Sequence, residues 1–186
     1  MNPFILVDIE TDGLSLVRNT ILEVGALFVD FYTLELKAQF HRVRHLENPE
    51  AGADPTVLRM HSENGLFEAS RAAPKKGEVC ADLTELDHDF ADWIEECGGR
   101  YDAVKDYGNV LMGGSSIHFD DKFIKMHFPR VTSRLHYRLF DIRTVRMDTE
   151  AKYNISCPLP STGPEHRSIA DCLYTLEMLR WARGVR

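Results

Sequence analysis

The hydrophobic positions near the N-terminus follow the pattern of β-strands. Residues 4–9, 20–30 and 34–43 are rich in apolar, β-branched and aromatic side chains, and Thr11-Asp12-Gly13 supplies turn residues after the first of them. Short connections favour antiparallel pairing, so the three segments predict a meander. Within it the first strand can lie centrally and carry its polar side chains to one end of the sheet.

The second half of the chain changes to a helical period. Residues 82–97 begin with a capping-box pattern, Asp82 followed by Glu85, and stop at Gly98-Gly99. Their apolar residues recur at helical spacing: Leu83, Leu86, Phe90, Trp93, Ile94 and Cys97. This pattern predicts a helix with one face in the core.

Shorter segments complete the predicted elements. Residues 110–112 and 139–142 are expected to be strands, and the turn at residues 113–116 is expected to lead into a helix that ends before Pro129. A final helix is expected over about residues 168–181, because its apolar residues lie along one side. Residues 47–54 and 71–79 combine Pro, Gly and charged residues, which is typical of loops.

Length and composition fit one globular domain over residues 1–186. No apolar run approaches the roughly 18 residues of a membrane span. The chain enters its first strand directly after Met1-Asn2-Pro3, so no secretory signal is indicated and a cytoplasmic location is expected. The four cysteines form no C-x-x-C pair, which favours free thiols. A net charge of −7 argues against tracking along a long nucleic acid, but not against a short or terminal substrate.

Two acids in the first strand indicate metal chemistry. Asp8 and Glu10 are two residues apart, so they share one face of the strand, and Val7 and Ile9 face the other. Two carboxylates at such close range repel each other, and burial adds to the cost unless a cation or a proton neutralises them. Oxygen ligands of this kind suit Mg²⁺ or Mn²⁺. A solvent-facing edge of the strand is the alternative.

Three more residues lie where a site could use them. Asp120 falls in the first turn of the helix after the glycine-rich segment, His166 in the loop before the last helix, and Asp171 in the first turn of that helix. Alternatives stay open at this point. Asp121 could replace Asp120, and Asp171 taken alone could be an acid that complements the helix dipole.

The order and spacing of these residues resemble the DEDDh superfamily of 3′-to-5′ exonucleases. That superfamily has a D-x-E motif, carried here by Asp8 and Glu10, and a motif ending in an aromatic-Asp pair, carried here by Phe119-Asp120. Its third motif, H-x4-D, is carried here by His166 and Asp171. The three motifs span nearly the whole chain.

Within the superfamily the chain looks most like the oligoribonuclease family. Ser116-Ile117 with Asp120 and Phe123 resembles that family's N-S-I-x-x-D-x-x-F, and His136-Tyr137-Arg138 with Asp141 resembles its H-Y-R-x-x-D. Residues 59–66, Arg-Met-His-Ser-Glu-Asn-Gly-Leu, resemble its R-T-H-x-x-S-G-L. Ser115 and Arg143 depart from the family pattern, which usually has Asn and often Ser there, and no Trp lies near Thr56.

The resemblance implies a division of labour among the five motif residues. Asp8 would bridge two divalent cations, Mg²⁺ or Mn²⁺. Glu10 and Asp171 would complete one metal site, and Asp120 would support the other. His166 would take the proton from the attacking water, which suits an imidazole with an ordinary pKa near neutrality. Two such cations can deliver hydroxide to phosphorus and stabilise the leaving 3′ oxygen.

The resemblance also implies substrate contacts. Leu14 would be an apolar wedge against the terminal bases, although a core position is an alternative. Ser116 and His61 would contact the substrate backbone or a 5′-phosphate. Tyr137 and Arg138 would reach the partner subunit's site in a homodimer, where an Arg suits phosphate. From its residue type, Tyr137 could equally be a buried aromatic with a bonded hydroxyl.

Together these features predict an α/β fold of the ribonuclease-H-like type, with a mixed sheet flanked by helices. The expected activity is 3′-to-5′ hydrolysis of short single-stranded oligoribonucleotides to nucleoside 5′-monophosphates. A DNA-directed exonuclease of the same superfamily is one alternative. A non-catalytic nucleic-acid-binding module is another, but such a module would be expected to lack one of the acids or the histidine, and this chain has all five.

Overall fold

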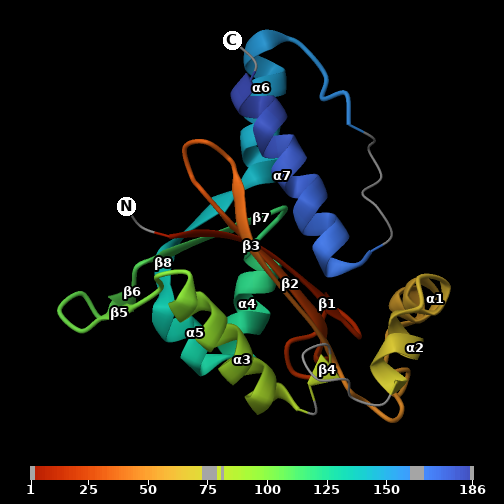
Figure 1. Ribbon diagram of the computed structural model, residues 1–186. Helices are drawn as coiled ribbons and strands as arrows, with labels where there is room; N and C mark the ends of the chain where they lie inside the picture. Colours follow the sequence, from red (N-terminus) through yellow and green to blue (C-terminus); the bar gives the residue numbers. More distant parts are fainter. Residues whose placement is uncertain (1–2, 73–78, 81, 160–165, 185–186) are drawn as a thin grey trace.

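A mixed β-sheet forms the centre of the fold (Figure 1). The computed structural model describes residues 3–72, 79–80, 82–159 and 166–184. In this part of the chain six strands pair in the order β4-β3-β2-β1-β7-β8. They are β1 (Phe4–Thr11), β2 (Ile21–Val29), β3 (Leu36–Arg44), β4 (Val79–Cys80), β7 (Val110–Gly114) and β8 (Leu135–Asp141). A separate small ribbon pairs β5 (Tyr101–Asp102) with β6 (Tyr107–Gly108).

The predicted meander is confirmed. β1 pairs with β2 and β2 with β3 in antiparallel register, while β7 lies parallel to β1 on its other side. β1 is therefore a central strand. The third strand was predicted to begin at Leu34, but it begins at Leu36, because the backbone of Leu34 turns with a φ of 58°. The predicted strand at residues 139–142 is longer than expected and ends at Asp141.

Seven helices surround this sheet in the described residues. They are α1 (Pro55–Glu63), α2 (Leu66–Arg71), α3 (Leu83–Glu96), α4 (His118–His127), α5 (Pro129–Arg134), α6 (Ile142–Tyr153) and α7 (Ser168–Gly184). The helices predicted before Gly98, before Pro129 and at the C-terminal end are confirmed as α3, α4 and α7. The other four were not predicted. Three of them are short or start at a proline, and α6 follows β8 without a loop.

The predicted loops have mixed outcomes. Residues 47–54 contain no helix or strand, as expected. In the stretch 71–79, Arg71 ends α2 and Val79 begins β4, and the intervening residues 73–78 lie outside the described residues. Cys97, Cys157 and Cys172 are free thiols, as the cysteine spacing indicated. In the described part of the chain, no helix combines the length and the apolar character needed to cross a bilayer.

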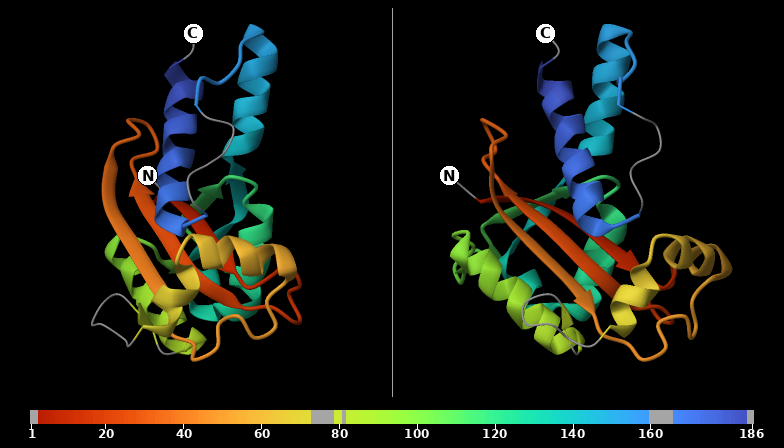
Figure 2. Two further views of the ribbon diagram at one scale, coloured as in Figure 1. Left: turned by 90° about the vertical axis from the view of Figure 1, so that its right-hand side faces the viewer. Right: turned by 45° about the vertical axis from the view of Figure 1, so that its right-hand side comes forward.

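Helices cover both faces of the sheet (Figures 1 and 2). α3, α4 and α5 lie on one face, where Ile5, Val7 and Ile9 of β1 join the larger hydrophobic core. α6 and α7 lie on the opposite face, where Phe4 and Leu6 pack. Side chains alternate along a strand, so Asp8 and Glu10 belong to the α7 face. This is the separation of faces that the sequence predicted.

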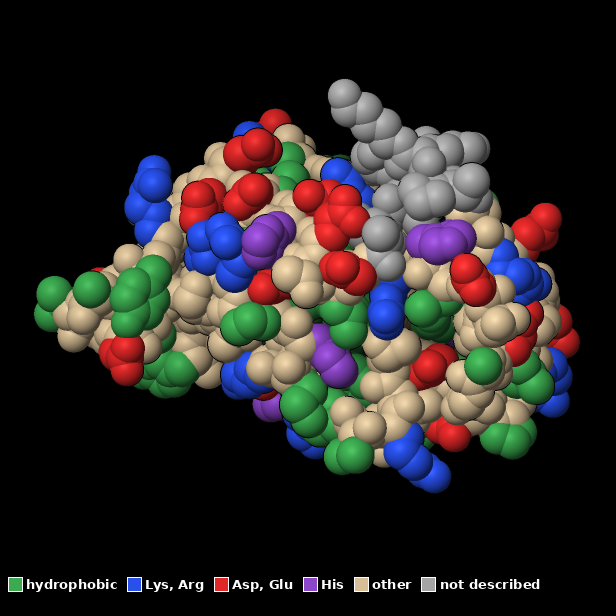
Figure 3. Space-filling view, turned by 90° about the horizontal axis from the view of Figure 1, so that it is seen from below, with side chains coloured by type: hydrophobic (Ala, Val, Ile, Leu, Met, Phe, Trp, Pro, Cys, Tyr) green, Lys and Arg blue, Asp and Glu red, His purple; other side chains and the backbone are tan. Residues whose placement is uncertain are grey.

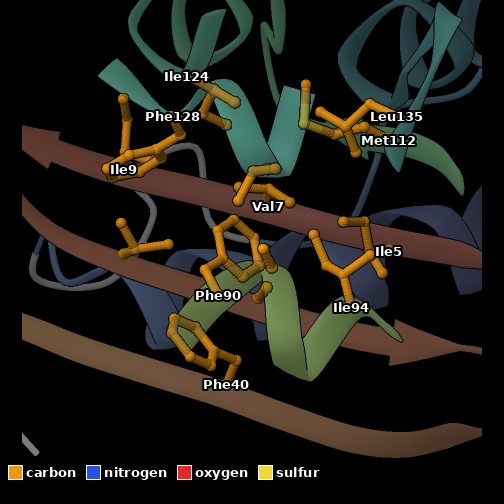
Figure 4. Close-up of a cluster of buried hydrophobic side chains, with 14 of the residues drawn as sticks. Ile5, Val7, Ile9, Phe40, Phe90, Ile94, Met112, Ile124, Phe128 and Leu135 are labelled. Carbon is orange, nitrogen blue, oxygen red and sulfur yellow. The ribbon is translucent and has the colours of Figure 1, made fainter. Parts of the chain in front are cut away.

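Aromatic packing ties α3 to the sheet (Figure 4). The side chain of Asp82 accepts a hydrogen bond of 2.8 Å from the backbone nitrogen of Glu85, which fixes the start of the helix. One turn further on, Phe90 is fully buried and stacks on Phe40 of β3 with ring centroids 4.8 Å apart. These contacts fix the position of α3 over β1 to β3.

Phe90→Ala should lower the free energy of unfolding by about 3–5 kcal/mol, because it leaves a large cavity against Phe40 in a fully buried cluster. Chemical denaturation of the metal-free protein measures this value. Val17→Ala, at a side chain that is 88% exposed, is the matched control and should change stability by less than about 0.5 kcal/mol. Equal losses for the two variants would contradict this assignment of the core.

Candidate active site

Three carboxylates converge at the end of β1. Asp8 and Glu10 lie on the α7 face of the strand, and Asp171 lies in the first turn of α7. One oxygen from each carboxylate lies within 4.8 Å of the others. Asp171 is more than 160 residues away from Asp8 and Glu10 in the sequence. The three meet because α7 packs across β1 and β2.

Proximity and burial raise the proton affinity of all three acids. Burial raises the pKa of Asp8 well above its ordinary range, and the charges of Asp120, Glu10 and Asp171 raise it further. Burial, followed by the charge of Glu23, raises the pKa of Glu10 to about 9. Burial raises the pKa of Asp171 to about 6, against the opposing effect of His166. Without a counter-charge, the cluster therefore retains protons at neutral pH.

Asp120 approaches the same strand from the other side. β7 pairs with β1 only over residues 4–6, so beyond that point the β1 edge is open to α4. There the carboxylate of Asp120 accepts a hydrogen bond of 3.0 Å from the backbone nitrogen of Ile9. Its neighbour Asp121 instead forms an ion pair of 2.7 Å with Lys125. Of the two candidates, Asp120 is the one whose charge acts on Asp8.

The donor set fits a divalent cation. Asp8, Glu10 and Asp171 offer hard oxygen ligands at convergent positions, and their raised pKa values record the repulsion that a cation would relieve. Asp120, outside the group within 4.8 Å, acts on Asp8 from the open edge of β1. The acidic cluster thus fits the predicted binding of divalent metal.

His166 lies between two cavities. A cavity of about 310 Å³ is lined by the three clustered acids, by His166 and by residues of α6 and α7, among them Arg143, Arg146 and Tyr174. A second cavity, of about 620 Å³, is lined by His166 and residues of α1, including Thr56, Arg59 and Asn64. Figure 2 shows α1 beside the start of α7. The two cavities share His166 as a lining residue. The exposed imidazole therefore faces open space next to the acids.

The other predicted substrate residues take different positions. Leu14 is 74% exposed, so the alternative that it belongs to the core is wrong. Its backbone nitrogen donates to Asp54, the N-cap residue of α1. Ser116 is exposed, with a φ of 58°, next to Ser115, which lines the first cavity.

His61 is fully buried, which contradicts a direct contact with a phosphate. Its Nε2 lies 3.1 Å from the backbone oxygen of Thr11 and 3.6 Å from the Glu10 carboxylate. Burial lowers its pKa, so the ring is neutral and can donate to these oxygens. His61 therefore stabilises the end of β1 through its contact with the backbone oxygen of Thr11.

Tyr137 and Arg138 lie away from both cavities. Tyr137 is 56% exposed, so the alternative of a buried aromatic is wrong. It stacks on His136 with ring centroids 4.5 Å apart and packs against Tyr107 of β6. The guanidinium of Arg138 lies 4.7 Å from the centre of the Tyr137 ring. A role for these side chains in substrate binding requires a second copy of the chain.

Several site residues were not predicted from the sequence. Arg143 and Arg146 line the first cavity because α6 starts directly after β8 and points its first turns toward α7. Glu23 is fully buried opposite Glu10 in the β1–β2 register. The sequence signal for Glu23 is an acid within an apolar strand. No motif includes this residue, so it was not predicted as part of the site.

Comparison with known proteins agrees with this geometry. The chain is 31% identical over 180 residues to an oligoribonuclease of Corynebacterium glutamicum (strain R), covering 95% of this chain and 76% of the relative. The chain belongs to the oligoribonuclease family. A probable oligoribonuclease of Schizosaccharomyces pombe is 22% identical over 183 residues, covering 98% of this chain and 68% of that relative. No protein-family model matches the chain.

Solved structures of similar fold are larger exonucleases. Exonuclease I of Methylocaldum szegediense gives a TM-score of 0.65 at 13% identity, covering 100% of this chain and 41% of that one. Exonuclease I of E. coli in complex with a dT13 oligonucleotide gives 0.58 at 14% identity, covering 99% and 41%. The predicted ribonuclease-H-like α/β fold is confirmed. As a member of the oligoribonuclease family, the protein is a nuclease of the DEDDh superfamily of 3′-to-5′ exonucleases.

The stability of the metal-free protein should fall as pH rises. Because the folded-state pKa of Glu10 is about 9 against an ordinary 4.5, its stabilising proton is fully present below about pH 4.5 and is lost as pH rises toward 9. Urea denaturation with a chelator between pH 5 and 9 should show this slope, and saturating Mn²⁺ should reduce it. Glu10→Gln is the control and should flatten the metal-free slope. An unchanged slope in that variant would assign the titration to other groups.

Proposed function

We propose that the protein is a metal-dependent exoribonuclease that removes nucleoside 5′-monophosphates from the 3′ ends of short single-stranded RNA. The observation that carries this proposal is the convergence of Asp8, Glu10 and Asp171 within 4.8 Å, next to the exposed His166. Membership of the oligoribonuclease family supports the substrate class. A cytoplasmic location and a single domain over residues 1–186 stay predictions.

Two divalent cations, Mg²⁺ or Mn²⁺, would be held by the acids. Asp8, Glu10 and Asp171 would provide oxygen ligands directly, and Asp120 would support the second position from the open edge of β1. When bound, such ions activate the attacking water and stabilise charge on the phosphate and the leaving oxygen. The raised pKa values of the acids mean that binding would release protons.

His166 would act as the general base. Its imidazole lines both cavities, so it can take a proton from water near the carboxylates while a nucleotide lies on either side. The φ of 46° at His166 places this side chain at a sharp bend just before α7. The attacking water would give a proton to a ring nitrogen as its oxygen bonds to phosphorus, and the bond from phosphorus to the 3′ oxygen of the shortened RNA would break. That oxygen takes up a proton and leaves with the RNA.

The shape of the site favours a short substrate. Two cavities flank His166, one beside Arg143 and Arg146 and one beside Arg59, so cationic side chains are available for phosphate on both sides. Leu14 projects from the loop after β1 and would lie against a terminal base. On the face of the molecule in Figure 3, acidic and basic side chains are interspersed. With a net charge of −7, this surface favours local contacts at a strand end.

A DNA-directed exonuclease is the second candidate. The E. coli exonuclease I structure with a dT13 oligonucleotide has the same fold, which motivates including DNA among the substrates. A binding module without turnover is disfavoured because all five motif residues are present and four of them meet around the end of β1.

Purified protein should shorten 5′-labelled RNA of two to twenty nucleotides in Mn²⁺ or Mg²⁺ and be inactive with a chelator. Asp8→Asn should lower kcat by about 10³-fold or more, because it removes the shared ligand of the proposed metal site. The measurement is the initial rate of mononucleotide release for each length, on ribose and deoxyribose oligomers. Asp121→Asn is the matched control and should keep activity close to that of the wild type. Activity in the presence of chelator would refute the metal-dependent mechanism.

We further propose a homodimer. Tyr137, which is exposed, forms an aromatic group with the half-buried Tyr107 and His136 at the β5–β6 ribbon, where Val104 is 96% exposed. Light scattering at the assay concentration should give twice the chain mass, 2 × 21.3 kDa. Val104→Asp with Tyr137→Ala should shift the protein toward the monomer, because it replaces exposed apolar surface with charge and removes a ring. A monomer mass for the wild type would rule out a subunit-crossing role for Tyr137.

A further inference from the structure

An ion pair between the fully buried Glu23 and the half-buried Arg167 lies next to the acid cluster. Glu23 of β2 is fully buried and pairs across the strands with Glu10. Its carboxylate accepts three hydrogen bonds from the guanidinium of Arg167, from Nε at 3.1 and 3.2 Å and from Nη2 at 2.8 Å. His41 Nε2 lies 2.7 Å from the same carboxylate. A carboxylate held in this way stays ionised: burial acts to raise its pKa, but the bonds from His41 and Arg167 lower it to about 2.

The same carboxylate also holds the beginning of α7. The backbone nitrogen of Ser168, the first residue of the helix, donates to Glu23 at 2.9 Å, which satisfies one of the free N–H groups of the first turn. Gly25 permits this close approach, since a Cβ there would lie 2.7 Å from atoms of Ser168. Two independent features of β2 are therefore fitted to the segment 167–168.

His166 directly precedes the anchored segment 167–168. Its backbone has a φ of 46°, which is unfavourable for a residue with a side chain and has to be maintained by its surroundings. On one side, its carbonyl accepts a hydrogen bond of 2.7 Å from the Asn64 side chain at the end of α1. On the other side, the next residue is Arg167. The backbone of His166 is thus held between α1 and β2.

The rest of α7 is anchored by other contacts. Cys172 is buried, with its Sγ 3.4 Å from the backbone oxygen of Gly25, and Leu176 and Leu179 pack in the core on this face. The helix that carries Asp171 therefore keeps its place through packing that does not involve Arg167. The segment that carries His166 is instead held by the polar contacts of Glu23 with Arg167 and Ser168 and by the Asn64 side chain.

We infer that Glu23 and Arg167 are positioning residues, which hold the backbone of His166 so that its imidazole lies beside the acid cluster. The inference rests on the proposed function, in which His166 is the general base. A displacement of about 1 Å in such a group is enough to lower a rate by 10²-fold. The positions of the metal-binding acids would be little affected, because Asp8 and Glu10 lie on β1 and Asp171 is held by the packing of α7, although the charge of Glu23 also acts on Glu10.

The test is a double-mutant cycle with His166. Arg167→Lys keeps the charge but loses the fork of donors, and Glu23→Gln keeps the size but loses the charge. Each should lower kcat for mononucleotide release from a short RNA at saturating Mn²⁺ by about tenfold to a hundredfold, with KM within about threefold of wild type. The Mn²⁺ affinity should stay within about threefold of wild type in Arg167→Lys, which conserves the charge, whereas Glu23→Gln also removes a charge that acts on Glu10. In a His166→Ala background, the same substitutions should change the remaining kcat by less than about twofold, because the base they position is absent.

Arg180→Lys is the matched control. Arg180 also anchors α7, through a guanidinium that donates to the backbone oxygen of Leu34 at 2.7 and 3.3 Å, but at the opposite end of the helix. It should leave kcat unchanged in both backgrounds. Equal losses of kcat with and without His166, or a loss of Mn²⁺ affinity in Arg167→Lys that matches its loss of kcat, would overturn the inference and leave a purely structural role.

Amide hydrogen exchange supplies a readout that does not depend on activity. In Arg167→Lys and Glu23→Gln, the amides of residues 166–168 should exchange at least about tenfold faster, while those of residues 172–182 should keep their wild-type rates. Uniformly faster exchange along α7, or no change at residues 166–168, would refute the positioning role. A wild-type protein without metal-dependent release of mononucleotides would instead refute the proposed function, and the exchange experiment would still decide whether the pair holds this segment.

Discussion

The repulsion among carboxylates at the end of β1 is the constraint on which the rest of the structure depends. Asp8 and Glu10 share a face of a central strand, and α7 adds Asp171 to the same small volume. Such an arrangement costs stability and persists only where protons or cations neutralise it. The remaining architecture supplies rigidity against this repulsion: β2 and β7 pair with β1 on its two sides, and the two hydrophobic layers hold α4 and α7 against it.

Charge balance behind the site follows the same logic. Glu23 adds to the repulsion on Glu10, and Arg167, which pairs with Glu23, acts on Glu10 in the opposite direction. His61, neutral and buried, satisfies the carbonyl of Thr11 without adding a charge. Arg167 therefore offsets part of the negative charge behind the acid cluster, and the three acids line the cavity where cations and a phosphate would bind.

The sequence predicted the parts of this site that depend on spacing within a single element. The i, i+2 relation of Asp8 and Glu10 fixed their common face, and the apolar periodicity located α3 and α7. Local pattern could not predict what depends on contacts between distant segments. Glu23 is recognisable in the sequence only as an acid in an apolar strand. Its role arises from contacts with residues about 145 positions away.

Helices without a clear local signal were missed for a related reason. α6 begins at Ile142, immediately after β8, and its start is fixed by Asp141 accepting a hydrogen bond from Thr144. Arg143 and Arg146 thereby enter the cavity, although the sequence placed the first of them only as a departure from a family pattern. His61 matched a family motif, yet its burial shows that a motif position does not define which way a side chain faces.

The open edge of β1 beyond Leu6 has a consequence for how this scaffold can change. The three clustered acids stand on the central strand β1 and on α7, whereas other parts of the cavity walls come from α1 and α6, which have few contacts with the sheet. Substitutions in those walls can accumulate without disturbing the carboxylates. Evolution can therefore retune which nucleotide ends are accepted while the hydrolytic centre remains the same.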